Sequence, residues 1–143
     1  MNTETPPPQD LTVHQTSKVL EIVFANGERH RIPFELMRVY SPSAEVQGHG
    51  PGQEVLQTGK RLVGLLDLEP VGNYGIKPTF SDGHDSGIFS WTYLYHLASQ
   101  QGPLWAEYEQ RLKDTSKNKR VEVGSLPFFL GDTFFTPLGV YYV

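Results

Sequence analysis

Residues 81–91 read Ser-Asp-Gly-His-Asp-Ser-Gly-Ile-Phe-Ser-Trp, and the fold predicted from the sequence is arranged around this stretch. The pair Asp82-Gly83 predicts a tight turn, because glycine adopts the backbone conformations that turns require. Ser90 stands where a side chain caps the first turn of a helix, and apolar residues recur at helical spacing after it. The stretch therefore joins a turn, which holds a histidine between two aspartates, to the start of a helix.

Strands are predicted before this stretch. A β-branched and aromatic run at residues 18–24 leads to an Asn-Gly pair at 26–27, and a second short run follows at 29–32. Asn-Gly between two such runs favours a hairpin with a type I′ turn, since both residues tolerate a positive φ. Two more strands are predicted at residues 62–68 and 73–80.

Helices are predicted between the strands and after them. Pro33 starts a helical turn, and Ser41, which is followed by proline, predicts the cap of a second short helix. Two longer helices are expected downstream, with the helix-breaking pair Gly102-Pro103 between them. Because the order is mainly strands and then helices, we expect an α+β fold: a small two-layer domain with helices packed on one face of an antiparallel sheet.

The domain boundaries follow from changes in composition. A chain of 143 residues is long enough for one domain with its own core. Residues 1–16 are polar and proline-rich, so we predict a disordered leader there, without the apolar run of a signal peptide or a membrane anchor. The domain is predicted to span residues 17–114. Residues 115–143 are interpreted as a basic linker followed by an apolar tail.

The composition excludes several classes of function. The chain contains no cysteine, which rules out disulfides, thiolate metal sites and cysteine nucleophiles. No run of about 18 apolar residues occurs, so no membrane span is expected and a cytoplasmic location is the default expectation. The net charge of −4 argues against nucleic acid as a partner. Ser81, Ser86 and Ser90 lack the strand–turn–helix frame of the Gly-x-Ser-x-Gly hydrolases.

Three interpretations of the histidines remain open. The first is a structural turn in which Asp82 hydrogen-bonds its own backbone and His84 is hydrogen-bonded or exposed. The second is a divalent metal site with nitrogen and oxygen ligands, formed if His49 approaches His84 beside Asp82 and Asp85. The third is acid–base chemistry at His84 with one of these aspartates. Adjacent strand residues point to opposite faces, so His84 and Asp85 share a cavity only if a turn re-aims one of them.

Three segments carry a resemblance to a known family: Ser-Pro-Ser-Ala-Glu-Val-Gln-Gly-His-Gly-Pro-Gly at 41–52, Glu-Pro-Val-Gly-Asn-Tyr at 69–74, and Asp-Gly-His-Asp-Ser-Gly-Ile-Phe-Ser-Trp at 82–91. In this order they resemble the small bacterial DUF971 proteins, the stand-alone form of the gamma-butyrobetaine hydroxylase-like N-terminal domain. The resemblance covers roughly residues 18–112 and implies a compact α/β domain. In the hydroxylases this domain precedes a separate iron- and 2-oxoglutarate-dependent catalytic domain, which the resemblance does not include.

The resemblance also implies the position of a zinc site. In the hydroxylases a Cys-x-Cys-x-x-Cys run and a later histidine hold zinc, and the matching positions here are Ser41, Ser43, Val46 and His84. Two hydroxyls and an aliphatic side chain cannot replace three thiolates as zinc ligands. The family's zinc site is therefore not expected in this chain, although a different divalent metal site remains an alternative.

Similar domains are also fused to P-loop ATPases that resemble iron–sulfur cluster carriers, which implies a partner-binding or metal-trafficking role. We therefore predict a non-enzymatic accessory domain that binds a protein partner and is linked to metal or iron–sulfur protein maturation. A metal-binding module and a small acid–base enzyme at His84 are the alternatives. The predicted partner-binding surface comprises Gln47, Gly48, His49, Gly50, Ser81, Asp82, Gly83, His84 and Asp85.

Overall fold

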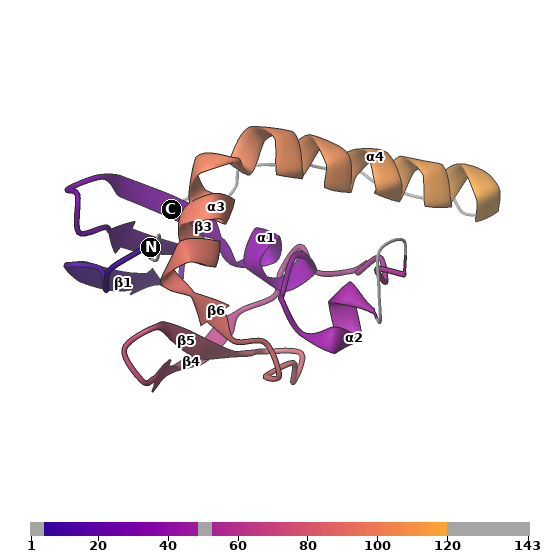
Figure 1. The fold of residues 1–143 in the computed structure, drawn as a ribbon. Coiled ribbons are helices and arrows are strands. Elements are labelled where there is room, and N and C mark those ends of the chain that lie inside the picture. The colour runs from indigo at the N-terminus through magenta and orange to yellow at the C-terminus, as the bar shows by residue number, and fades with distance from the viewer. Residues whose placement is uncertain (1–4, 49–52, 120–143) are drawn as a thin grey trace.

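The computed structural model of the protein describes residues 5–48 and 53–119. In chain order the elements are β1 (Asp10–His14), β2 (Val19–Val23), β3 (Arg29–Pro33), α1 (Phe34–Val39), α2 (Ala44–Gln47), β4 (Leu65–Val71), β5 (Gly75–Phe80), β6 (Phe89–Ser90), α3 (Trp91–Ser99) and α4 (Gln101–Lys119) (Figure 1). The predicted α+β class is confirmed. The strands are antiparallel, as expected, but they are divided between two small sheets.

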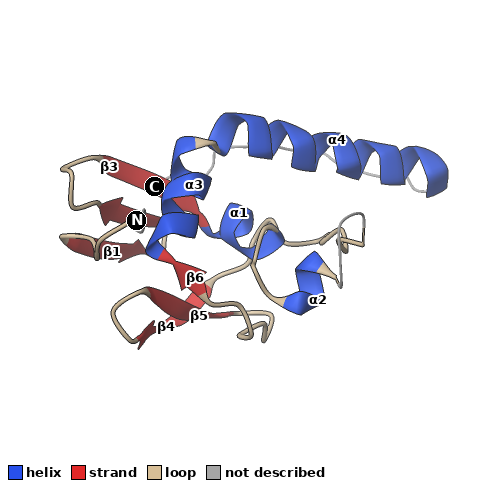
Figure 2. Cartoon of the chain, viewed as in Figure 1, coloured by secondary structure: helices blue, strands red, loops and turns tan. Residues whose placement is uncertain are grey.

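Each sheet has three strands in chain order, β1-β2-β3 and β4-β5-β6 (Figure 2). The helix α1 follows β3 without a loop, and α3 follows β6 in the same way. Both helices contact β3, and α4 contacts α1 and α3 in turn. The helices are thereby assembled beside the first sheet, while the far half of α4 extends past the rest of the domain (Figure 1).

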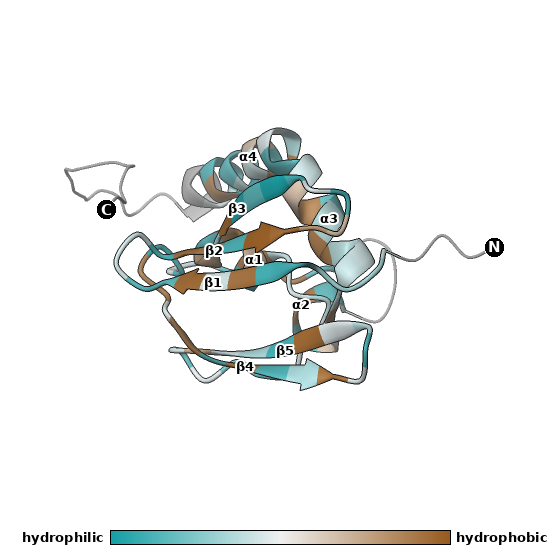
Figure 3. Cartoon of the chain, turned by 90° about the vertical axis from the view of Figure 1, so that its left-hand side faces the viewer, coloured by the Kyte–Doolittle hydropathy of each residue, from teal (hydrophilic) through white to brown (hydrophobic). Residues whose placement is uncertain are grey.

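One hydrophobic core serves both sheets. Hydrophobic and polar positions alternate along β1 (Figure 3). The core includes Leu20, Ile22, Ile32, Phe34, Leu65, Phe80, Phe89, Leu94 and Leu97. Because burial of one such side chain contributes about 1.5–3 kcal/mol, this shared core is the main stabilising feature of the domain.

The hairpin of β2 and β3 is confirmed, but the predicted type I′ turn is wrong. Gly27 has a φ of +91°, whereas Asn26 does not have the positive φ that a type I′ turn requires. The N–H of Gly27 donates to Phe24 O at 2.8 Å, and the N–H of Phe24 donates to Glu28 O at the same distance. The connection is therefore a three-residue loop that ends in a bulge at glycine, which keeps the asparagine out of the left-handed region.

The disordered leader predicted for residues 1–16 is wrong for β1. This strand pairs antiparallel with β2, with Leu11 opposite Ile22 and Val13 opposite Leu20. Leu11 and Val13 pack against the core. The alternation of these two aliphatic residues with polar ones is the strand signal that the neighbouring prolines and the polar composition concealed.

The end of the domain also differs from the predicted boundary. The helix α4 continues to Lys119, beyond the boundary at residue 114, so the start of the predicted basic linker is helical. The rest of the predicted linker and tail, residues 120–143, lies outside the described part of the chain. Within the described residues, no helix is long and apolar enough to cross a membrane.

Candidate functional site

The turn after β5 has the form that the sequence predicts. The N–H of Gly83 donates to Phe80 O at 2.9 Å, and Gly83 has a φ of +92°, which favours glycine. The side chain of Asp82 accepts a hydrogen bond from the N–H of His84 at 3.2 Å. His84 is buried and Asp85 is exposed, so the two neighbours point in opposite directions, as expected for adjacent extended residues.

The imidazole of His84 connects this turn to the segment around α2. Its Nε2 lies 2.9 Å from Ser41 Oγ, and its Nδ1 lies 2.9 Å from Glu45 Oε1. A carboxylate accepts hydrogen bonds and does not donate them, so Nδ1 carries a proton, and in the neutral imidazole Nε2 accepts the hydroxyl proton of Ser41. Because the His84 side chain is only 2% exposed, these two bonds satisfy both of its polar atoms away from water.

A second pair of hydroxyls lies beside this chain of hydrogen bonds. Ser43 Oγ is 2.7 Å from Ser86 Oγ, and it also accepts the N–H of Glu45 at 3.1 Å as the cap of α2. The cap of α2 is therefore Ser43, not the predicted Ser41. Gly87 fits against Ser41 because it has no side chain, since a Cβ there would lie 2.2 Å from Ser41 Oγ.

Asp82 is held by two cations from other segments. Its Oδ2 accepts from Arg38 Nε at 2.9 Å and from Lys60 Nζ at 2.5 Å. Burial alone would raise the pKa of Asp82, but the hydrogen bonds from Lys60, the His84 N–H and Arg38 outweigh it and lower the pKa to about 2. Asp82 is thus an ionised structural anchor at neutral pH.

Asp82, His84 and Asp85, the described residues of the predicted metal site, do not face one common point. His84 is engaged by Ser41 and Glu45, Asp82 is engaged by cations, and Asp85 points outward. Among residues 5–48 and 53–119, no three histidine, aspartate or glutamate side chains are grouped to hold a metal ion. His49 lies outside the described residues, so the four-residue metal site stays a prediction.

The residues at the family's zinc positions do not fit zinc. Ser41 and His84 are in contact, which agrees with a shared site, but their hydrogen bond occupies the histidine nitrogen. Ser43 bonds Ser86 instead of facing an ion, and Val46 is buried and offers no donor atom. In this chain hydrogen bonds between the same two segments take the place that metal ligation would have.

The order Ser41–His84–Glu45 resembles the nucleophile, base and carboxylate of a hydrolase, but Ser41 is fully buried. Gly87 packs against its hydroxyl, so a substrate carbonyl cannot approach the oxygen. The acid–base role predicted for His84 receives no support from this geometry. The hydroxyl serves as a hydrogen-bond bridge between two segments.

The predicted partner surface is only partly exposed. Ser81, Asp82, Gly83 and Asp85 lie on the outside of the turn, whereas His84 supports the turn from within. Gln47 is half-buried and donates through its side chain to Ser41 O at 3.0 Å. Gly48 has a φ of +76° and packs closely on the backbone of Gln53, while His49 and Gly50 fall outside the described residues.

Sequence reasoning missed the side chains that hold this turn in place. Glu45 is far from His84 in the sequence, and so are Arg38 and Lys60 from Asp82. The motif at residues 41–47 can be recognised in the sequence. It does not indicate that Glu45, instead of Asp82 or Asp85, is the side-chain partner of His84.

The fold and the buried histidine together define a small α+β domain in which the segment around α2 is tied to the turn after β5. The gamma-butyrobetaine hydroxylase-like N-terminal family matches residues 11–95, more than half of the chain. The chain belongs to this family.

Solved structures agree with this assignment, whereas no curated protein matches the chain. An NMR solution structure is 46% identical, with a TM-score of 0.68, and the match covers 78% of this chain and 88% of that one. A second NMR structure is 40% identical over 99% and 96% of the two chains, with a TM-score of 0.73. A crystal structure of a DUF971 protein of unknown function from Acidithiobacillus ferrooxidans is 36% identical over 64% and 91%, with a TM-score of 0.53.

Proposed function

We propose that the protein is a non-enzymatic accessory domain that binds a protein partner through the outside of the turn at residues 81–86. The observation that carries this proposal is the contrast between the two sides of the turn. Its inner side is fixed by the hydrogen bonds of Asp82, His84 and Ser86, whereas its outer side, including Asp85, is exposed. A surface that is already ordered loses little conformational entropy when a partner binds.

Exposed aliphatic side chains border this turn. Leu62 is 80% exposed, and the segment that carries it is joined to the turn by Lys60, which bonds Asp82, and by Gly64, whose N–H bonds Ser81 Oγ at 2.7 Å. Ile88, directly after the turn, is 42% exposed. We call Leu62, Ser81, Asp82, Gly83, Asp85 and Ile88 the turn surface. Apolar side chains beside polar ones are the usual composition of a protein interface.

The test is a binding measurement with variants of the turn surface. The wild-type protein captures partners from a cell extract, the partners are purified, and dissociation constants are measured for Asp85→Lys and Ile88→Ser. Both changes are expected to weaken a genuine partner at least about tenfold, because each removes or repels a contact at the centre of the interface. The matched control is Asp10→Lys, an equal change of charge at an exposed residue of β1. The proposal would be contradicted if all three variants weakened binding equally, or if none of them weakened it.

The finer predictions from the resemblance are part of the proposal and rest on it alone. The link to metal or iron–sulfur protein maturation names the kind of partner to look for first. A metal titration of the chelator-stripped protein, followed by NMR of the histidine rings, tests the metal-binding alternative, because joint shifts of His49 and His84 at one equivalent would favour it.

A further inference from the structure

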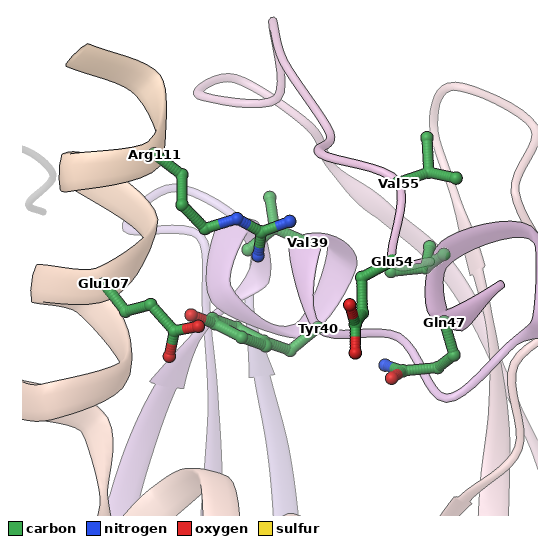
Figure 4. Close-up of a pocket in the computed structure, with 8 residues that line it drawn as sticks. Val39, Tyr40, Gln47, Glu54, Val55, Glu107 and Arg111 are labelled. Atoms are coloured by element: carbon green, nitrogen blue, oxygen red, sulfur yellow. The ribbon is translucent and has the colours of Figure 1, made fainter. Parts of the chain in front are cut away.

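A pocket of about 400 Å³ lies between α4 and α2 (Figure 4). Its walls come from the end of α1, from α2, from residues 54–55 and from the middle of α4. It is separate from the buried hydrogen bonds of His84, yet α2 contributes to both, through Gln47 in the pocket and Glu45 at the histidine. Pockets of this size hold small ligands or single side chains.

Three valines and a tyrosine contribute to the lining of the pocket, although most of its exposed surface is polar. Val39 and Val46 are buried, Val55 is half exposed, and the ring of Tyr40 extends toward α4 (Figure 4). The Tyr40 hydroxyl is already satisfied, because it donates to Leu104 O at 2.8 Å. An aliphatic stem is the kind of group that packs on such walls while it keeps a polar head near water.

Two carboxylates stand at the mouth of the pocket, on opposite sides. Glu54 comes from the segment after α2 and Glu107 comes from α4 (Figure 4). Among the described residues, neither carboxylate has a hydrogen bond or an ion pair within 4.0 Å. Both are exposed, so they are free to accept hydrogen bonds from a cationic group placed between them.

Among the described residues, Arg111 is the one cation that lines this pocket, and it is directed toward Tyr40 (Figure 4). Burial and the charge of Glu107 raise the pKa of Tyr40, and the charge of Arg111 and a hydrogen bond with it oppose that shift. The side chains of Glu107 and Arg111 lie beside Tyr40 (Figure 4). Two carboxylates and one guanidinium leave the lining with a net charge of −1. A cation is therefore favoured over an anion, and the repulsion from Arg111 limits its affinity.

We propose that this pocket receives a lysine or arginine side chain of the partner protein. The inference rests on the proposed function, because it takes the ligand to be a protein partner; α2, which contributes Gln47 to the pocket, also carries Glu45, the partner of His84. The stem of the partner's side chain packs against Val39, Val46 and Val55, and its charged head lies between Glu54 and Glu107. One chemical group, an aliphatic stem that ends in a cation, matches both the charge and the shape of this pocket.

The test is an NMR titration that needs no partner protein. The methyl signals of Val39, Val46 and Val55 are followed while the peptides acetyl-Gly-Lys-Gly-amide, its norleucine analogue and its glutamate analogue are added. The lysine peptide is expected to cause saturable shifts of these signals. The double variant Glu54→Gln/Glu107→Gln is expected to bind this peptide about three- to tenfold more weakly than wild type, since exposed ion pairs are individually weak. Arg111→Gln is expected to tighten binding about twofold. Glu69→Gln, an exposed carboxylate on β4, is the matched control and leaves binding unchanged.

Several results would overturn the inference. Equal binding of the norleucine or glutamate peptide would show that charge does not select the ligand, and equal binding by the Glu54/Glu107 double variant would show the same. Tighter binding of free butylammonium than of the lysine peptide, by about tenfold or more, would make the pocket a small-molecule site. If the peptide results hold while Asp85→Lys leaves partner binding intact, the proposed turn surface fails and the pocket does not.

Discussion

The imidazole of His84 joins two segments that lie about 40 residues apart in the sequence, through Ser41 on one nitrogen and Glu45 on the other. Each hydrogen bond is buried on the histidine side, so loss of one partner leaves a polar atom that water cannot reach. The stability of the turn therefore depends on each of the two hydrogen bonds of the imidazole. The buried nitrogen Arg38 Nη1 has no hydrogen-bond partner within the described residues, so it adds no comparable link.

His84→Ala is expected to lower the free energy of unfolding by about 2–4 kcal/mol, because it removes two hydrogen bonds and leaves a cavity beside Phe80. Urea denaturation followed by tryptophan fluorescence measures the change. His96→Ala, at an exposed position of α3, is the control and is expected to change stability by less than about 0.5 kcal/mol. Similar effects of the two substitutions would show that the hydrogen bonds of His84 contribute little.

A second buried polar pair makes stability depend on pH. Glu35 of α1 accepts the hydroxyl of Tyr108 at 2.7 Å, and burial raises the pKa of Glu35 although this hydrogen bond opposes the rise. A carboxyl with a raised pKa binds its proton more tightly in the folded state than in the unfolded one. Its contribution to stability is therefore present below its usual value of 4.5 and is lost as the pH rises through the folded pKa.

In Glu35→Gln the side chain has no proton to lose, so the pH-dependent loss of stability is absent. The amide oxygen of the glutamine can still accept the hydrogen bond of the Tyr108 hydroxyl. The stability of the variant relative to wild type is therefore expected to increase between about pH 4 and about pH 7. Urea denaturation of both proteins at the two pH values gives the difference directly. Glu69→Gln is the matched control at an exposed site. A difference that stays constant or falls with pH would mean that Glu35 is not destabilised by burial.

At the scale of elements, some short-range signals were read correctly, whereas the limits of the paired strands were not. The side chain of Ser90 caps α3 as predicted, accepting the N–H of Tyr93 at 3.0 Å, because a cap depends on residues three positions apart. The strand predicted at 62–68 lies instead at Leu65–Val71. Its limits are set by pairing with β5, including a register shift between Leu65 and Asp67, and a single strand's sequence does not contain that information.

The packing of Gly87 on Ser41 gives an element-level test. Gly87→Ala places a Cβ only 2.2 Å from Ser41 Oγ, so Ser41 must turn away from His84, and stability is expected to fall by about 1–3 kcal/mol. Gly102→Ala in α4 meets no atom within 4 Å and is expected to be neutral or to stabilise by up to about 1 kcal/mol. Thermal unfolding of the two variants compares them. A loss of equal size at both glycines would indicate a general effect of helix or turn propensity instead.

At the scale of the whole molecule, the class of the fold and the family were accessible from the sequence, but the number of sheets was not. The prediction of one sheet followed from the order of strands and then helices along the chain, whereas two separate sheets bury side chains such as Leu20 and Leu65 in one core. The candidate site was located at the right turn, yet its supporting partners come from α1, α2 and the segment that holds Lys60. Contacts over such separations depend on the assembled fold.

The first strand is an edge strand of the first sheet, and the residue directly after it is hydrogen-bonded to the second sheet, which makes residues 1–15 an informative part to remove. Leu11 and Val13 of β1 pack on the core, and the side chain of Gln15, just after the strand, donates to Leu65 O at 2.8 Å. Nε2 of His14 lies 2.7 Å from Oε1 of Glu21, a residue of β2. Loss of β1 would therefore uncover part of the core, leave Glu21 with fewer partners and turn β2 into an exposed edge.

Deletion of residues 1–15 is expected to lower the free energy of unfolding by about 2 kcal/mol or more and to promote association, because two half-buried aliphatic side chains and a ladder of hydrogen bonds are lost. Deletion of residues 1–8 leaves β1 intact and is the matched control, expected to remain close to wild type. Urea denaturation measures stability, and size-exclusion chromatography measures association. If both deletions behave alike, β1 does not contribute to the stability of the domain, and the leader predicted from composition would describe its role better than the pairing with β2.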